Sequence, residues 1–134
     1  MAKKTLKVDS VAEAYLALLA DRGVDYMFGN AGTDFATVIE ALSKAQLGES
    51  NAPIPVTVPH ENVAVSMAHG YFLATGRIQT VMLHVSVGTA NGVCGVFNAT
   101  RERVPILFTA GRTPINEDGA DGARSIYIHW AQEM

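Results

Sequence analysis

The sequence predicts an α/β fold: an open, doubly wound parallel sheet with helices on both faces. Apolar residues alternate between helical and strand periodicity in the order helix, then strand–helix three times, then strand. Residues 81–87 are almost continuously apolar, which is typical of a strand buried on both faces. The 134 residues, 49% of them hydrophobic, allow one domain with a real core. We therefore expect a single domain over 1–134 that forms part of a longer chain.

The first predicted helix begins at Ser10-Val-Ala-Glu13, because a hydroxyl and a carboxylate at this spacing satisfy free N–H groups of the first turn. Its apolar positions follow at helical spacing: Val11, Ala14, Tyr15, Leu18 and Leu19. Gly23 stands where the C-terminal end of a helix favours glycine. A short strand is expected next, over residues 24–28.

Residues 29–32 predict a turn, after which Thr33 can cap a second helix. That helix carries Phe35, Val38, Ile39 and Leu42 on one face. A strand at 54–58 and a third helix at 62–75, closed by Gly76, follow. These segments give the second strand–helix unit of the predicted sheet.

A third strand is expected at 81–87, and a glycine-rich turn at 88–92 leads into a helix that reaches about Arg103. The last predicted strand covers 104–110, and a polar loop begins at 113. A further element is expected over residues 124–134, without a Gly, Pro or polar tail to end it. This predicts a chain truncated at its C-terminus.

Charge and composition exclude several classes of function. The net charge of −3 comes with no basic stripe for nucleic acid and no polybasic cluster for a membrane surface. No apolar run reaches the roughly 18 residues of a spanning helix. The N-terminus lacks the apolar segment of a signal peptide, and the single Cys94 fits a reducing compartment. We expect a cytoplasmic protein.

Three predicted strand-to-helix loops, at 29–33, 59–61 and 88–92, carry the candidate site. In a parallel sheet these loops lie along one edge, where ligands bind in open α/β folds. Glu61 opens a helix directly after a strand, so its carboxylate can face a ligand. The alternative is a first-turn carboxylate that only stabilises the helix dipole.

The segment from His60-Glu61-Asn62 to Gly76 resembles the helix after the catalytic glutamate in thiamine diphosphate enzymes of the benzoylformate decarboxylase and acetolactate synthase family. Gly88-Thr-Ala-Asn91 resembles the family's Gly-x-x-Asn turn beside the cofactor's aminopyrimidine. The resemblance implies that Glu61 is catalytic, since the family's glutamate hydrogen-bonds that ring and promotes formation of the ylid. It also implies cofactor-binding roles for four residues: Gly32, Gly88, Thr89 and Asn91.

His84 distinguishes branches of this family. A lone histidine in an apolar strand is often a satisfied core group. However, the segment Leu83-His84-Val-Ser-Val-Gly88 resembles the part of benzoylformate decarboxylase in which a histidine transfers protons at the substrate. A neutral imidazole gives and takes protons near pH 7, which suits this role. The resemblance therefore implies that His84 is catalytic and contacts the substrate.

Two further residues are candidate substrate contacts. The loop at 29–33 resembles the family's first loop, although Ala31 departs from the usual proline. Thr33 then stands where the benzoylformate branch touches the substrate carboxylate, and a helix N-cap is its other reading. Arg112 departs from the Gly-Gln of many acetolactate-type members; it either pairs with an anionic substrate group or is solvated. The resemblance gives His129, Trp130 and Gln132 a weaker claim to the substrate pocket.

The resemblance implies the N-terminal pyrimidine-binding domain of an enzyme that acts on a 2-oxo acid. The reaction is decarboxylation or carboligation, through a ylid and an enamine on thiamine diphosphate. The Mg²⁺ ligands are expected in a domain absent from this chain, with no metal site on the chain itself. A diphosphate-binding domain or subunit is then needed, within a homodimer or homotetramer. The alternatives are a non-catalytic regulatory or scaffold domain and the small subunit of a two-subunit 2-oxo acid decarboxylase.

Overall fold

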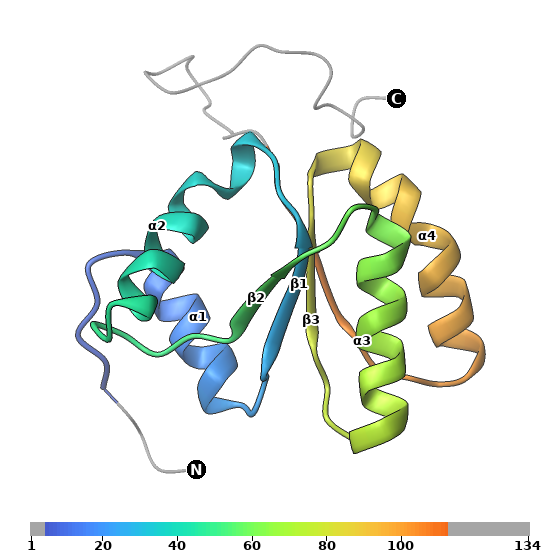
Figure 1. The fold of residues 1–134 in the computed structure, drawn as a ribbon, viewed down its shortest axis with the longest axis horizontal. Coiled ribbons are helices and arrows are strands. Elements are labelled where there is room, and N and C mark those ends of the chain that lie inside the picture. Colours follow the sequence, from blue (N-terminus) through green and yellow to red (C-terminus); the bar gives the residue numbers. More distant parts are fainter. Residues whose placement is uncertain (1–4, 113–134) are drawn as a thin grey trace.

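The computed structural model describes residues 5–112 as one four-stranded parallel sheet in the order β2-β1-β3-β4 (Figure 1). The elements in chain order are α1 (Val11–Asp21), β1 (Tyr26–Asn30), the short 3₁₀ helix η1 (Thr33–Phe35), α2 (Ala36–Gln46), β2 (Ile54–Thr57), α3 (Glu61–Thr75), β3 (Thr80–Leu83), α4 (Val85–Arg101) and β4 (Leu107–Ala110). The predicted fold class and order of elements are confirmed.

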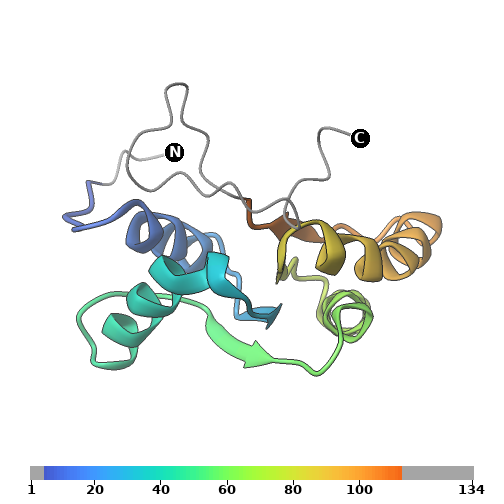
Figure 2. The same cartoon turned by 90° about the horizontal axis from the view of Figure 1, so that it is seen from above.

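The helices form two pairs, α1 with α2 and α3 with α4, on opposite sides of the strands (Figures 1 and 2). Side chains alternate across each strand, so Met27 and its neighbour Phe28 enter different layers. The layer under α1 and α2 is built from Leu16, Met27, Phe35, Val38 and Ala41. The layer under α3 is built from Phe28, Val58, Ala64, Val65, Ala68, Val81 and Leu83. Two cores therefore hold the sheet from both faces.

Several predicted helix ends are confirmed. The Ser10 hydroxyl accepts a hydrogen bond from the Glu13 backbone N–H at 3.2 Å. Glu13 does not complete the reciprocal half of the predicted capping box, because its carboxylate accepts from the Asp9 backbone N–H instead. Gly76 ends α3 in the left-handed conformation, with φ of 72°. Local sequence therefore fixes where α1 begins and where α3 ends.

The predicted third strand at 81–87 is wrong in its second half. β3 ends at Leu83 and α4 already begins at Val85, so residues 88–92 lie inside a helix and not in a turn. Valine-rich sequence favours a strand, but the buried positions of α4 recur at helical spacing: Val85, Gly88, Gly92, Gly95 and Ala99. The small residues on this face let α4 lie close to its neighbours, and this tertiary packing overrides strand propensity.

The N-cap role predicted for Thr33 is also wrong. Thr33 is the first residue of η1, and Gly32 occupies the cap position without a capping side chain. The remaining differences are small shifts in the limits of strands and helices. β1 begins two residues later than predicted and β4 three residues later, as expected where a loop enters an extended strand. Within residues 5–112, no helix is long and apolar enough to cross a membrane.

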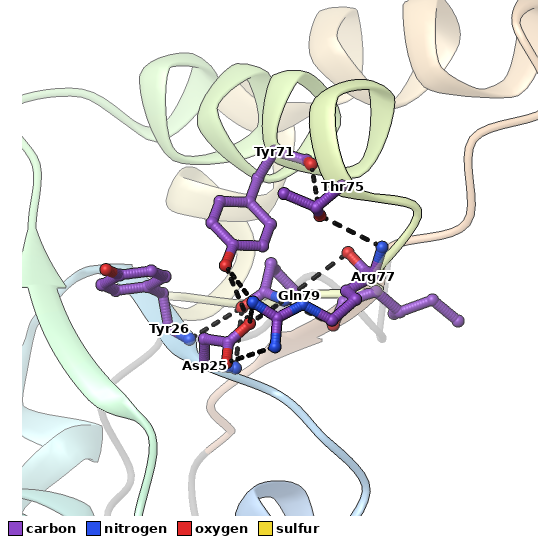
Figure 3. A network of polar contacts seen from close by, with 7 residues as sticks. Asp25, Tyr26, Tyr71, Thr75, Arg77 and Gln79 are labelled. Atoms are coloured by element: carbon purple, nitrogen blue, oxygen red, sulfur yellow. Dashed lines mark hydrogen bonds and ion pairs between the residues drawn. The ribbon is translucent and has the colours of Figure 1, made fainter.

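A network of polar side chains closes the amino edge of the sheet, where β1 and β3 begin (Figure 3). Gln79 is fully buried, and its carbonyl oxygen accepts hydrogen bonds from the backbone N–H groups of Asp25 and Tyr26, at 3.0 and 2.7 Å. The Tyr71 hydroxyl donates to Asp25 at 2.8 Å, and Arg77 bonds to both. The network ties the end of α3 to the starts of two strands.

The carboxyl edge is the upper edge in Figure 1 and has the geometry of a ligand site. β1 and β3 are neighbours there, but the helices that follow them, α2 and α4, depart to opposite faces of the sheet. Such a switch point leaves a crevice between two diverging strand ends, and ligands of open α/β sheets bind there.

Candidate functional site

The candidate site is assembled from four segments that are distant in sequence and meet at the carboxyl edge. Asn30 is the last residue of β1, and Glu61 is the first residue of α3. His84 lies between β3 and α4, and Asn91 lies within α4. Because the strands are parallel, their carboxyl ends and the segments that follow them lie at one edge of the sheet. The fold therefore gathers the predicted residues Glu61, His84 and Asn91.

Glu61 is held by two side-chain amides. The Asn30 Nδ2 group donates to Glu61 Oε1 at 3.3 Å, and the Asn91 Nδ2 group donates to Oε2 at 3.1 Å. The Glu61 side chain is 12% exposed, so it is mostly buried yet still reachable from solvent. The N-terminus of α3 adds favourable dipole charge. The carboxylate is therefore fixed from both sides and remains accessible to a ligand.

Asn30 was not among the predicted site residues. From the sequence, Asn30 is expected only as part of the loop at 29–33. The position of Asn30 at the end of an apolar strand could have indicated this role, because a side-chain amide there can bind a carboxylate at the same edge. What the sequence lacked was the pairing of β1 with β2, which brings the ends of these strands together.

Gly88 lies directly beside this carboxylate. A methyl group at Gly88 would stand 3.5 Å from Glu61 Oε1, so glycine leaves that side of the carboxylate uncovered. The next residue, Thr89, uses its hydroxyl within the helix, where it donates to the Val85 carbonyl at 2.7 Å. The cofactor-binding roles of Gly88 and Thr89 stay predictions.

A second polar pair lies at the same edge. His84 Nδ1 is 2.6 Å from Asp34 Oδ1, and the exposed fractions of the two side chains are 31% and 7%. Asp34 is not among the predicted site residues, and fifty positions separate it from His84 in the sequence. Asp34 directly follows Thr33, whose loop is predicted at this edge, and this position could have indicated Asp34 as a site residue. The buried Asp34 holds a partly exposed imidazole.

Two glycines make room for this pair. A methyl group on Gly32 would overlap the His84 ring, and one on Gly111 would overlap the Asp34 carboxylate. The predicted site residue Gly32 therefore packs against His84. Asp34 Oδ2 is buried and finds no hydrogen-bond partner among residues 5–112. Such an acceptor costs about 1–3 kcal/mol when it is left unpaired.

The backbone after His84 is strained. Val85 has φ of 42°, a left-handed value that a β-branched residue rarely adopts. Residues in such regions cost on the order of 1–3 kcal/mol and cluster at functional sites. The side chain of Val85 is buried, so its packing opposes relaxation of this backbone next to His84.

Thr33 and Arg112 also lie at the carboxyl edge, and both are exposed. Thr33 opens η1 next to Asp34, and Arg112 follows β4 by two residues. Their predicted contacts with substrate stay predictions. His129, Trp130 and Gln132 lie outside the described residues. Within residues 5–112, no group of three or more His, Cys, Asp or Glu side chains could hold a metal ion.

Comparison with known proteins gives a consistent assignment. Residues 9–134 match the family described as thiamine pyrophosphate enzyme, N-terminal TPP binding domain. The chain is 32% identical to the acetolactate synthase large subunit of Haemophilus influenzae over 87% of its own length and 19% of that protein. It is 43% identical to benzoylformate decarboxylase of Pseudomonas aeruginosa over 40% of its length and 10% of that protein.

Comparison of the fold with solved structures supports the same family assignment. The thiamine diphosphate-dependent 4-hydroxybenzoylformate decarboxylase of Rhodococcus jostii RHA1 superimposes with a TM-score of 0.68 at 30% identity. The match covers 78% of this chain and 18% of that structure. The chain thus spans about a fifth of the length of such proteins. On the matched sequence and the shared fold, the chain belongs to the thiamine pyrophosphate enzymes, as their N-terminal TPP binding domain.

Proposed function

We propose that this chain forms the aminopyrimidine side of a thiamine diphosphate site in an enzyme that converts a 2-oxo acid. The observation that carries the proposal is the Glu61 carboxylate, held by Asn30 and Asn91 at the switch point of the sheet. Thiamine diphosphate, when bound, supplies the electron sink for cleavage or formation of the bond next to the oxo group.

The residues at this edge fit an aminopyrimidine. That ring presents an acceptor nitrogen beside an amino donor, and a carboxyl group can pair with such nitrogen groups. Glu61 retains 12% exposure, and Gly88 leaves the carboxylate open on one side. The two asparagine amides fix the carboxylate plane, so little freedom is lost when a ring binds. Glu61 would then hold and return a proton at the ring nitrogen.

His84 supports decarboxylation over carboligation. An imidazole beside the reacting centre can deliver a proton to the carbon that has lost CO₂, whereas a carboligase forms a new carbon–carbon bond there. Thr33 and Arg112 are candidates to bind the carboxylate of the substrate, through a hydroxyl and a guanidinium group. Transfer to an acceptor aldehyde or oxo acid, as in acetolactate synthesis, is the alternative reaction.

The rest of the active site belongs to another domain or subunit in this proposal. The diphosphate and its Mg²⁺ require acidic and amide oxygens beyond the residues that hold the pyrimidine. A diphosphate-binding domain, in the same chain or in a partner subunit, would supply them. We propose a homodimer or homotetramer, because the pyrimidine and diphosphate ends of the cofactor are then held where two domains face each other. We also propose that the protein is cytoplasmic.

The test is Glu61→Gln in the protein at its natural length, with thiamine diphosphate and Mg²⁺ present and a panel of aliphatic and aryl 2-oxo acids. Loss of a positioned proton-transfer group costs about 10²–10⁴-fold in rate, so kcat should fall at least a hundredfold. Glu40→Gln, an exposed carboxylate on α2, is the matched control and should leave kcat unchanged. Full turnover by Glu61→Gln would refute the assignment, and wild-type protein without turnover or cofactor binding would favour a scaffold role.

A further inference from the structure

We propose that Asp34 is the positioning residue for His84: it fixes which ring nitrogen carries the hydrogen and which way the imidazole faces. The role of His84 in proton transfer rests on the proposed function, whereas the contact between Asp34 and His84 does not. The pair consists of Asp34 Oδ1 and His84 Nδ1, 2.6 Å apart. Fifty positions separate the two residues in the sequence.

The hydrogen-bond chemistry determines the tautomer. An ionised carboxylate is only an acceptor, so the short contact requires a hydrogen on His84 Nδ1. In the neutral ring, Nε2 is then the nitrogen with the lone pair. Any proton that His84 takes or gives at the reacting carbon must pass through Nε2. Histidines with an oriented partner on one nitrogen commonly work in this way through the other nitrogen.

The surroundings hold the pair in one geometry. Asp34 lies in η1, where the next residue, Phe35, is anchored in the core at 4% exposure. Gly32 lies against the ring of His84, and Gly111 lies against the carboxylate of Asp34. On the other side, the strained Val85 fixes the backbone that carries His84. The Asp34–His84 pair is therefore held by residues of three segments of the chain, at 32–35, 84–85 and 111.

The burial of Asp34 is hard to explain by stability alone. Its Oδ2 atom is buried without a hydrogen-bond partner among the described residues, which is unfavourable for folding. A residue selected only for packing at this position would carry no such acceptor. The arrangement is understandable if the carboxylate is retained for its bond to His84, at the expense of some stability.

The direct test is ¹⁵N NMR of the histidine ring nitrogens in the protein at its natural length, with the His84 signals assigned by their absence in His84→Ala. Wild-type protein should show His84 with the hydrogen on Nδ1. Asp34→Asn should shift the ring toward the Nε2–H tautomer, since the amide offers a donor as well as an acceptor. The control is Glu40→Gln, which removes one negative charge at an exposed position of α2 and should leave the His84 signals unchanged.

Kinetics distinguishes a positioning role from a general structural one. Loss of the carboxylate that orients a metal-bound histidine costs about 10–100-fold in activity, and we expect Asp34→Asn to lower kcat by a similar factor at similar thermal stability. In a His84→Ala background the same substitution should cause no further loss, because Asp34 acts only through His84. Additive losses would overturn the proposal, and so would a wild-type ring with the hydrogen on Nε2.

A second variant and the NMR readout distinguish a folding failure or a wrong proposed function from failure of the Asp34–His84 proposal. If Asp34→Asn does not fold, Gly32→Ala provides a second variant, because its methyl group would push the His84 ring away from Asp34 and give the same tautomer shift. The NMR result needs no turnover. A protein that lacks 2-oxo acid activity but shows the tautomer shift would therefore refute the proposed function and keep the Asp34–His84 pairing.

Discussion

The two ends of the sheet carry polar clusters of opposite character. At the amino edge, the side chains of Asp25, Tyr71, Arg77 and Gln79 bond to one another and to the starts of the strands (Figure 3). At the carboxyl edge, Asp34 keeps a buried acceptor unpaired among the described residues, and Val85 adopts a strained backbone. The first cluster satisfies its own polar groups, and the second keeps polar groups in a geometry that a ligand can complete.

This difference separates residues that hold the fold from residues that serve a site. Buried polar groups are normally paired, and exceptions call for a specific reason. Gln79 meets the rule, because its amide both accepts and donates within the network. Asp34 breaks the rule at the edge where ligands of this fold class bind. Substitutions at the amino edge should therefore reduce stability, and those at the carboxyl edge should reduce function.

The largest effect on stability is expected for Gln79→Ala. The substitution removes the acceptor for two backbone N–H groups, those of Asp25 and Tyr26, and leaves a cavity at a fully buried position. An unsatisfied buried group costs about 1–3 kcal/mol, so a total loss of about 3 kcal/mol or more is expected in urea unfolding. Gln46→Ala, at an exposed position of α2, is the control and should change the unfolding free energy little. A loss below about 1 kcal/mol at Gln79 would contradict the structural role of the amino edge.

The organisation of the fold could be predicted because alternating periodicities leave few topologies for a chain of this size. Glu61 and Asn91 were predicted as site residues, and Glu61 accepts a hydrogen bond from Asn91 in the structure. These residues belong to segments whose positions at one edge follow from the parallel sheet alone. The start of α4 was not predictable, since its valines favour a strand while its glycines acquire meaning only against the packed neighbours. Gly95, for example, lies against Val65 of α3.

Asn30 and Asp34 show the limit of sequence reasoning at the site. Each acts through a partner that is distant in sequence: Glu61 for Asn30, and His84 for Asp34. Asparagine and aspartate are also the usual residues of turns, so a local reading gives them an ordinary role. The contacts depend on strand register, which sets the ends of β1 and β3 side by side. A short sequence window contains no information about that register.

A smaller, pH-dependent effect is expected for Tyr71→Phe. The hydrogen bond to the Asp25 carboxylate raises the pKa of Tyr71 above its usual value of 10.0. A raised pKa in the folded state means that the neutral phenol contributes stability below about pH 10 and loses that contribution as the pH rises through the folded value. The wild type should therefore exceed Tyr71→Phe in urea midpoint near pH 8, and the gap should narrow above pH 10.

Asp25→Asn provides the control for this effect. Without the carboxylate acceptor, Tyr71→Phe should give the same small difference at every pH from 8 to about 11, because the main cause of the raised pKa is gone. A gap between wild type and Tyr71→Phe that widens with rising pH would contradict the sign of the linkage. It would also show that the amino edge does not depend on the neutral phenol.

The smallest effect on stability is expected for Glu61→Gln, although the same substitution has the largest expected effect on turnover. The glutamine keeps the shape of the side chain and can still bond to Asn30 or Asn91 after one amide rotates. Loss of the favourable charge at the N-terminus of α3, worth about 0.3–1 kcal/mol, is opposed by the lower desolvation cost of a neutral group. The urea unfolding free energy should therefore change by less than about 1 kcal/mol. A loss of unfolding free energy as large as that of Gln79→Ala would mean that Glu61 stabilises the fold. The carboxyl edge would then resemble the amino edge in its contribution to stability.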